Sequence, residues 1–268
     1  MTPLDQLLLL SALTVFVMLV SGNRQAAGWI ATLLYAFQAA ALLQMSGLGY
    51  GTTAAVESGV TLRVLDHVLH WRFDALSWFF ALITLGAALL SSWFSAGEWA
   101  QSYRRRGGSL RGLHTALALN VFSMLVLLAS GDLLSLFIGW ELVSWASFLI
   151  MALGGTTAIR YAMRYLTYAF AGAMAVLGGL VLVYSLVGSF EYQALKTAAA
   201  TMDGASLWLL LALFGAGFGV KMALLPFHLW QAKAYAETPG PGAAFLGAIS
   251  SRMGLFAIVI VLVQLIGI

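Results

Sequence analysis

The sequence of 268 residues contains no cysteine. A chain without thiols forms no disulfide, no thiolate zinc site, no Cys-ligated iron–sulfur cluster and no cysteine nucleophile. Charged residues are also scarce, at 9%, whereas they make up about 25% of an ordinary soluble domain. The scarcity of charge excludes a soluble domain. We expect this chain to bind neither a cofactor nor a metal, so that any redox cofactors would lie in partner subunits.

Apolar residues take the place of the missing charge. Hydrophobic residues make up 62% of the chain, and the mean hydropathy is +0.94. The formal net charge of +3 is modest, and the basic residues lie in short loops rather than in a stripe with interleaved aromatics, which argues against nucleic acid as a partner. The composition predicts an all-α polytopic membrane protein in contact with lipid.

Apolar runs divide the chain into eight predicted spans, each long enough to cross about 30 Å of hydrocarbon. The predicted spans are Leu4–Val20, Ala26–Gly47, Ala75–Trp93, Leu113–Ser130, Leu133–Leu153, Tyr165–Val187, Ser206–Leu225 and Pro241–Ile266. The first has neither the flanks nor the cleavage site of a signal peptide, so we interpret it as a retained helix. In the loop 48–74, the partly alternating run VTLRVLDHVLHWRF predicts a short external hairpin.

The basic residues predict the orientation, because cytoplasmic loops carry the excess of Lys and Arg. Odd-numbered loops hold eight of the 13 basic residues, among them Arg104, Arg105 and Arg106, whereas even-numbered loops hold three. We therefore expect a multi-pass protein of a prokaryotic-type inner membrane, with its N-terminus outside. The arginine cluster is interpreted as a topology signal, with contact to anionic lipid as the alternative.

Three ionisable residues remain inside the predicted spans. Lys221 lies at the apolar middle of FGAGFGVKMALLPFHL, which predicts a discontinuous seventh helix that is interrupted at Pro226. At the α-helical rise, Glu141 lies about 13–14 Å into the fifth span and Arg252 roughly 16 Å into the eighth. These depths allow all three charged groups to reach one central layer of the membrane.

A buried Glu141–Lys221 pair can be interpreted in two ways. An ionisable side chain at the bilayer centre costs at least about 2.5 kcal/mol, so such residues usually face protein and mark an ion pathway. A carboxylate at about 4 Å stabilises an ammonium by roughly 4 kcal/mol at an effective dielectric of about 20, but by only about 1.7 kcal/mol at about 10 Å. Moving Glu141 would therefore make Lys221 release or regain a proton. The alternative is a structural pin that only orients two helices.

The later spans resemble a known family. Three segments carry the resemblance: DLLSLFIGWELVSWASFLIMALGG, AIRYAMRYLTYAFAGAMAVLGGLVLVYSLVG and GFGVKMALLPFHLWQAKAYAETPGPGAAFLGAISSRMGLFAI. In this order and in these spans, they are similar to the antiporter-like subunits of respiratory complex I, whose relatives occur in Mrp-type antiporters and membrane-bound hydrogenases. The resemblance covers about Leu113–Ile268 and implies two regions: residues 1–112, an N-terminal three-helix region, and residues 113–268, a five-helix repeat that forms the input half-channel.

The resemblance also implies roles for individual residues. Glu141 matches the glutamate and Lys221 the lysine of the family's input pair, and His228 matches the histidine at the helix break. Arg252 stands where the family usually has a lysine; because arginine is almost never deprotonated, we expect a fixed charge there rather than a proton relay. Secondary candidates for the ion path are Lys233, Tyr235 and Ser144.

The resemblance implies an ion-translocating membrane subunit, with the proton as the expected ion, of a complex I-like or related energy-coupling complex. The chain itself offers no redox or hydrolytic site, so an enzymatic role would be that of a translocase subunit. Family members carry a second, inverted repeat. We therefore expect the sequence to be a fragment, a split subunit whose second half is another polypeptide, or a protein that provides one half-channel only. We expect a partner subunit along the eighth span to complete the second half-channel. Alternatives are a structural scaffold with a degenerate half-channel, a Na⁺/H⁺ antiporter subunit and a bicarbonate-uptake complex subunit.

Two weaker motifs have simpler interpretations. The glycines of Gly215–Gly219 lie in an apolar helix rather than after a strand, so they predict close helix packing and not a nucleotide-binding loop. His67 and His70 have a spacing that suits a metal ion, but an ordinary solvated loop is the expected alternative.

Overall fold

The computed structural model describes residues 1–45, 47, 55–64 and 66–267, without the side chains of 264 and 265. The helices are α1 (Pro3–Val20), α2 (Ala26–Leu43), α3 (Ala75–Ala96), α4 (Glu98–Arg105), α5 (Leu110–Leu128), α6 (Leu133–Ala152), α7 (Thr156–Val187), α8 (Tyr192–Thr201), α9 (Gly204–Lys221), α10 (Gln231–Glu237), α11 (Gly240–Phe245) and α12 (Arg252–Ile258). The other elements are the 3₁₀ helix η2 (Phe227–Trp230), the π-helical segments η3 (Leu246–Ser250) and η4 (Val259–Ile266), and the strands β1 (Val56–Glu57), β2 (Leu62–Val64), β3 (His67–Leu69) and β4 (Arg72–Phe73).

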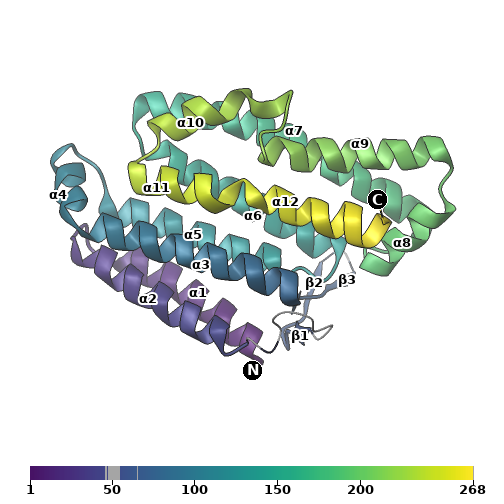
Figure 1. The fold of residues 1–268 in the computed structure, drawn as a ribbon, viewed down its shortest axis with the longest axis horizontal. Coiled ribbons are helices and arrows are strands. Elements are labelled where there is room, and N and C mark those ends of the chain that lie inside the picture. Colours follow the sequence, from purple (N-terminus) through teal and green to yellow (C-terminus); the bar gives the residue numbers. More distant parts are fainter. Residues whose placement is uncertain (46, 48–54, 65, 268) are drawn as a thin grey trace.

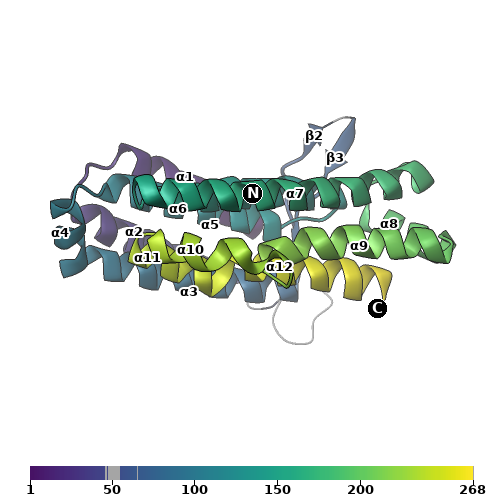
Figure 2. The ribbon, with the colours of Figure 1, turned by 90° about the horizontal axis from the view of Figure 1, so that it is seen from above.

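The long helices lie in two layers. One layer contains α2, α3, α9 and the run from α11 to α12, and the other contains α1, α5, α6 and α7 (Figures 1 and 2). The helices α5 and α6 are the most buried of the spans and pack tightly on one another. At their contact, a Cβ on Gly139 would lie 2.6 Å from the Cα of Leu127, so only glycine permits this approach. As a result, α6 runs through the interior of the bundle.

Eight helical runs are long and apolar enough to cross a membrane, which confirms a multi-pass, all-helical membrane protein. Several predicted boundaries differ from the structure, and two of them concern the region around Lys221. The helix α7 begins at Thr156 rather than at Tyr165, because nothing in the segment between them breaks a helix and its arginines, Arg160 and Arg164, are exposed. The helix α9 ends at Lys221 rather than at Leu225, so the predicted interruption of this span is present but begins earlier.

Aspartates begin three of the spans. Asp74, Asp132 and Asp203 accept hydrogen bonds from backbone N–H groups in the first turns of α3, α6 and α9. Such caps satisfy donors that have no partner within the helix, and a negative charge is favoured at this end of the helix dipole. At the exposed Asp203, hydrogen bonds from the Ser206 side chain and from backbone N–H groups hold the pKa of the carboxyl below its usual value.

The described part of the loop contains the predicted hairpin. Strands β2 and β3 pair antiparallel, and β1 pairs with β4. Residues 48–54 and 65 of the same loop lie outside the described residues. His67 packs edge-on against Tyr184 and Phe190, at centroid distances of 5.5 and 4.9 Å. The Asp132 side chain accepts a hydrogen bond from the backbone N–H of His70, which joins this loop to the start of α6.

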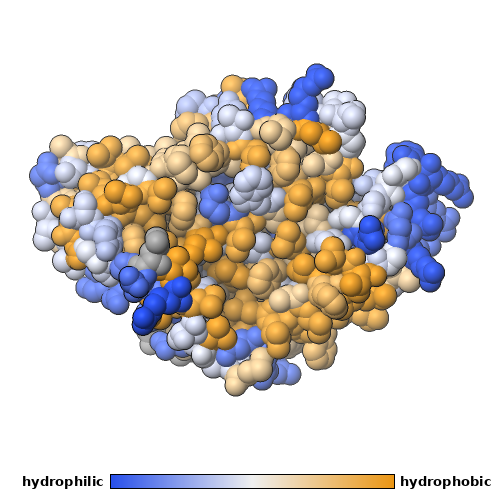
Figure 3. All heavy atoms as spheres, turned by 180° about the vertical axis from the view of Figure 1, so that it is seen from behind, coloured by the Kyte–Doolittle hydropathy of each residue, from blue (hydrophilic) through white to orange (hydrophobic). Residues whose placement is uncertain are grey.

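The bundle has two hydrophilic ends and an apolar middle. The arginine-bearing α4 lies at one end, while the strands and α8 lie at the other (Figure 2). Hydrophobic residues cover most of the face between these ends (Figure 3). Large apolar side chains such as Phe16, Leu33 and Phe170 are exposed, which matches a protein surrounded by hydrocarbon.

Candidate functional site

The helix α9 approaches α7 through a glycine. A Cβ on Gly217 would lie 2.4 Å from Cγ2 of Val176 and 2.8 Å from the carbonyl oxygen of Gly172, both on α7, whereas a Cβ on Gly215 would meet nothing within 4 Å. The segment Gly215–Gly219 is helical throughout, as expected for packing glycines rather than for a phosphate-binding loop. The close approach at Gly217 holds the end of α9 against α7.

Lys221 is the last residue of α9, and it is 3% exposed. The sequence placed it at the middle of a helix, but Ala223 adopts a left-handed φ of +53° and Pro226 follows, so the helix ends immediately after the lysine. This position is electrostatically favourable, because the negative end of a helix dipole stabilises a cation in the last turn.

Hydroxyl groups surround the ammonium of Lys221. Its Nζ donates hydrogen bonds to the Tyr165 hydroxyl at 2.6 Å and to Oγ of Ser144 at 3.3 Å. The Tyr165 hydroxyl in turn donates to the backbone carbonyl of Ser144 at 3.3 Å. In the part of the chain that the structure describes, no ion pair joins Glu141 to Lys221, so the predicted pair is replaced here by contacts with neutral groups.

Aromatic rings close the space around the same ammonium. The Lys221 Nζ lies 5.3 Å from the ring centroid of Tyr165 and 6.0 Å from that of Trp140, at the outer limit of a cation–π contact. Trp230 packs against the Tyr165 ring at 4.7 Å and donates from Nε1 to the carbonyl of Val220 at 3.0 Å. The tryptophan therefore fixes both the tyrosine and the peptide that precedes the lysine.

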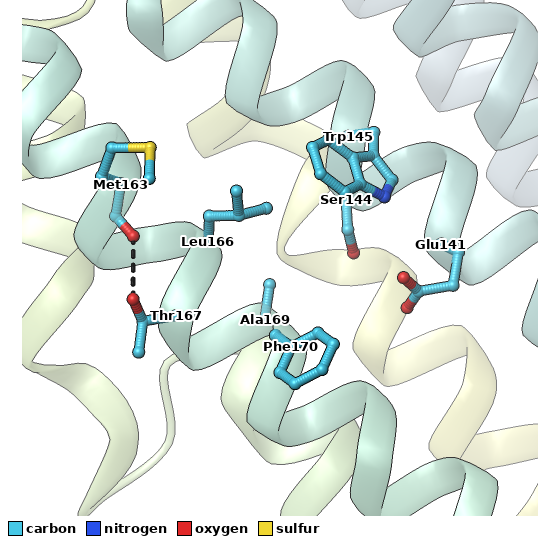
Figure 4. A pocket seen from close by; sticks show the side chains of 8 residues that line it. All are labelled: Glu141, Ser144, Trp145, Met163, Leu166, Thr167, Ala169 and Phe170. Atoms are coloured by element: carbon cyan, nitrogen blue, oxygen red, sulfur yellow. Dashed lines mark hydrogen bonds between the residues drawn. The ribbon is translucent and has the colours of Figure 1, made fainter.

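The surroundings of the Glu141 side chain differ from those of the Lys221 ammonium. It lines an open pocket of about 400 Å³ between α6 and α7, together with Ser144 and apolar side chains that include Trp145 and Phe170 (Figure 4). One carboxylate oxygen of Glu141, Oε1, is buried and has no hydrogen-bond partner among the described residues. Because Glu141 and Ser144 are separated by three residues on α6, the carboxylate lies one helical turn from a hydroxyl that binds the ammonium.

The other predicted residues of the broken span lie apart from Lys221. His228 in η2 and Lys233 in α10 are exposed. The Tyr235 hydroxyl donates to the carbonyl of Leu246 in η3 at 3.4 Å. The structure thus brings Ser144 to Lys221, but it places His228 and Lys233 on the surface beyond the break.

Arg252 is exposed within the last membrane span. Its Nη1 donates to the carbonyl of Gly247 at 2.6 Å, one π-helical turn earlier along the same span. This backbone oxygen carries no compensating charge. The guanidinium therefore differs from the Lys221 ammonium, which lies entirely inside the bundle.

A second polar cluster is fully buried and was not predicted. The Asn120 side chain donates from Nδ2 to Oγ of Ser147 at 3.0 Å, and the Ser147 and Ser250 hydroxyls lie 3.1 Å apart. Asn120 Oδ1 is buried without a partner. Neutral serines and asparagines give no strong signal in an apolar sequence, and only their contact across α5, α6 and η3 makes them a cluster.

Sequence reasoning also missed Tyr165. It was placed at the start of a span, where tyrosines commonly mark the membrane interface. The additional turns of α7 before Tyr165 move it into the bundle, where it is 1% exposed. Recognition that TTAIRYAMR contains no helix breaker would have revealed this.

Comparison with known proteins identifies what this arrangement is similar to. The family description "NADH:quinone oxidoreductase/Mrp antiporter, TM" matches residues 130–267, just over half of the chain. The F(420)H(2) dehydrogenase subunit N of Methanosarcina mazei is 32% identical over 187 residues, which cover 69% of this chain and 37% of that protein. This chain thus spans well under half the length of that relative.

Solved structures share the fold. A chain of the membrane-bound sulfane sulfur reductase, an archaeal respiratory membrane complex, matches with a TM-score of 0.82 and 20% identity, over 97% of this chain and 41% of that one. A chain of the Mrp complex from Dietzia sp. DQ12-45-1b matches with a TM-score of 0.81 and 21% identity, over 96% of this chain and 28% of that one. At these identities the likeness concerns the fold alone.

Proposed function

Because the chain belongs to the NADH:quinone oxidoreductase/Mrp antiporter transmembrane family, we propose that it translocates protons as an antiporter-like subunit of a larger energy-coupling membrane complex. The observation that carries this proposal is the Lys221 ammonium, which is buried among membrane spans and is bound by hydroxyls only one helical turn from a carboxylate. A charged side chain among membrane spans has a high free-energy cost, and such residues usually mark an ion pathway.

In the proposed mechanism, Glu141 and Lys221 form a protonation switch. When the carboxylate approaches the ammonium, its field favours the protonated lysine; when it withdraws toward the open pocket, that stabilisation falls from roughly 4 kcal/mol at about 4 Å to about 1.7 kcal/mol at about 10 Å. The lysine then gives up its proton to the next acceptor. Glu141 suits this role because the described structure gives its buried oxygen no competing hydrogen bond.

The remaining predicted residues receive supporting roles. Arg252 acts as a fixed charge that orders water and a partner rather than as a carrier, because it keeps its proton. His228 and Lys233, exposed beyond the helix break, exchange protons with water or with a neighbouring subunit. Together with residues 113–268 as an input half-channel, these roles account for the polar groups near α9.

The last span offers the surface for the subunit that completes the path. Its exposed positions among the described side chains are Gly240, Ala244, Gly247, Ala248, Arg252, Leu255 and Val263. Small residues let another membrane helix approach closely, and an exposed guanidinium in a span requires protein or water rather than lipid. The expected partner is a membrane segment that brings a carboxylate to Arg252.

Orientation follows from the arginine-rich end. We assign the end of the bundle with α4 to the cytoplasm of a prokaryotic-type inner membrane and place the N-terminus outside. Since the chain lacks cysteine, a single Ser102→Cys or Thr61→Cys substitution gives one reactive thiol at an exposed site on either end. A membrane-impermeant maleimide should label Thr61→Cys in intact cells and Ser102→Cys only after lysis. The reverse pattern would refute this orientation.

The proposed translocation is tested in the assembled complex. Glu141→Gln and Lys221→Ala should each abolish proton movement in reconstituted vesicles while the complex still assembles. Lys196→Ala, which changes an exposed lysine of α8 outside the spans, is the matched control and should leave proton movement intact. Unimpaired translocation in both site variants would remove the proposed function.

A scaffold role remains the second candidate, favoured by the exposed and permanently charged Arg252. A scaffold with a degenerate half-channel would hold partner subunits along the last span without moving ions. It predicts that Glu141→Gln and Lys221→Ala leave activity unchanged, whereas replacing Gly247 or Ala248 with leucine dissociates the complex.

A further inference from the structure

The Tyr165 hydroxyl is the nearest hydrogen-bond partner of the Lys221 ammonium, at 2.6 Å. A phenolic hydroxyl has one hydrogen to donate and lone pairs to accept. Because its hydrogen points to the backbone carbonyl of Ser144, the lone pairs of the Tyr165 oxygen remain directed at the ammonium. The tyrosine is thus an oriented acceptor for the charged form of the lysine.

The tyrosine ring has little freedom to leave this position. It is 1% exposed and packs against Trp230, which is itself 1% exposed. Trp230 is anchored by its hydrogen bond to the carbonyl of Val220, the residue before Lys221. The lysine and its acceptor are therefore held by the same indole.

The ammonium and the carboxylate are served by separate groups in this structure. Lys221 bonds to the Tyr165 and Ser144 hydroxyls, while Glu141 lines the pocket between α6 and α7, and among the described residues its Oε1 has no hydrogen-bond partner. The described surroundings of Lys221 thus show what holds the charge when the carboxylate is not beside it. Without these hydroxyls, withdrawal of Glu141 would leave a buried cation with no acceptor, which is strongly disfavoured.

We propose that Tyr165 is a positioning residue that takes over the Lys221 ammonium when Glu141 moves away, so that the carboxylate and the tyrosine hydroxyl are alternating partners of one cation. This inference rests on the proposed proton translocation. It identifies the group that binds the Lys221 ammonium while Glu141 and Lys221 are apart. The alternation lowers the free-energy cost of separating Glu141 from Lys221, because the ammonium keeps a hydrogen-bond acceptor throughout.

The charged and titratable groups on the surrounding elements are few. Glu141 on α6 carries the opposite charge, and Tyr235 on α10 lies beyond Trp230, with ring centroids 5.8 Å apart. His228 on η2 and Arg252 on α12 are exposed. A pH effect of changing Tyr165 is therefore interpreted through Lys221 and Glu141 first, and then through Tyr235, which packs against Trp230.

The test is Tyr165→Phe in the assembled complex, which removes only the hydroxyl. The maximal proton-translocation rate should fall about tenfold, and the alkaline limb of the rate–pH profile should move down by about one pH unit, as expected when an ammonium loses one acceptor. Ser144→Ala, which removes the longer contact, should move the limb in the same direction by less. Tyr168→Phe, a half-buried tyrosine one turn away on α7, is the control and should change neither quantity.

Each outcome decides the inference. A wild-type rate and profile in Tyr165→Phe, with Glu141→Gln inactive, would overturn it while the proposed function stands. A lower rate with an unshifted profile would also overturn it, because that result indicates packing alone. If Glu141→Gln and Lys221→Ala leave the proton-translocation rate unchanged, the proposed function itself is wrong. Should Tyr165→Phe not assemble, the shift in Ser144→Ala decides.

Discussion

The two cations of the C-terminal spans, Lys221 and Arg252, lie in opposite surroundings. Lys221 is buried among hydroxyls and rings that the same chain supplies, whereas Arg252 is exposed and donates a hydrogen bond to a backbone carbonyl of its own span. The difference follows from the chemistry of the two groups. A lysine can exchange a proton and is controlled by its immediate neighbours, while an arginine keeps its charge, for which we propose a partner from another membrane segment.

The largest effect is expected at the lysine. Lys221→Arg keeps the charge but cannot release a proton, so proton translocation should fall at least about 100-fold, as it should for Lys221→Ala. The reciprocal change, Arg252→Lys, should leave most of the activity, because a fixed charge at that place is sufficient. Proton uptake by vesicles that contain the assembled complex measures both. An active Lys221→Arg variant would show that charge alone matters and would erase the distinction between the two sites.

The next effect concerns assembly. Arg252→Leu should weaken association with the neighbouring membrane segment by about 2–5 kcal/mol, because it leaves the partner's buried carboxylate unpaired. Co-purification at increasing detergent concentration measures this loss. Lys196→Leu, at an exposed position of α8 outside the spans, is the control and should not alter association. Equal retention of partners in the two variants would contradict a carboxylate at Arg252.

A smaller effect is expected from the contact that positions Lys221. Gly217→Ala should destabilise the chain by about 1–3 kcal/mol, since its new Cβ would overlap Val176 and the Gly172 carbonyl on α7. Gly215→Ala places its Cβ in open space on the same helix and should be neutral or slightly stabilising. The thermal unfolding midpoints (Tm) of the two purified variants measure this difference. Equal midpoints would mean that α7 and α9 are not held by this approach.

The smallest effect is expected in the neutral cluster near Arg252. Ser250→Ala removes one hydroxyl contact, but Ser147 still accepts from Asn120, so stability should fall by about 0.5–1.5 kcal/mol. Proton translocation should remain at its wild-type rate. A large loss of rate in this variant would show that the cluster belongs to the ion path and that Lys221 is not functionally separate from the last span.

The sequence predicts the spans well because twenty apolar residues in a row have few alternatives in a membrane. It also identifies Lys221 and Glu141, since charges in apolar runs are conspicuous. It does not predict their partners. Depth along a span says nothing about the direction in which a side chain points, so equal depth suggested an ion pair where the structure has hydroxyl contacts.

The ends of broken helices are harder still to predict. The sequence locates an interruption at Pro226, but α9 ends several residues earlier, where Ala223 adopts a left-handed conformation that alanine seldom favours. Tertiary packing decides such a conformation. Likewise, Arg160 and Arg164 suggested a loop, although helices readily carry exposed arginines at their ends.

The winding of the last span determines where its charge points. A π-helical turn contains about one residue more than an α-helical turn. If Leu246–Ser250 were wound as an α-helix instead, every residue after it would be rotated by about 100° around the axis. Arg252 would then face a different neighbour. The one additional residue in the π-helical turn therefore determines the direction in which the guanidinium points.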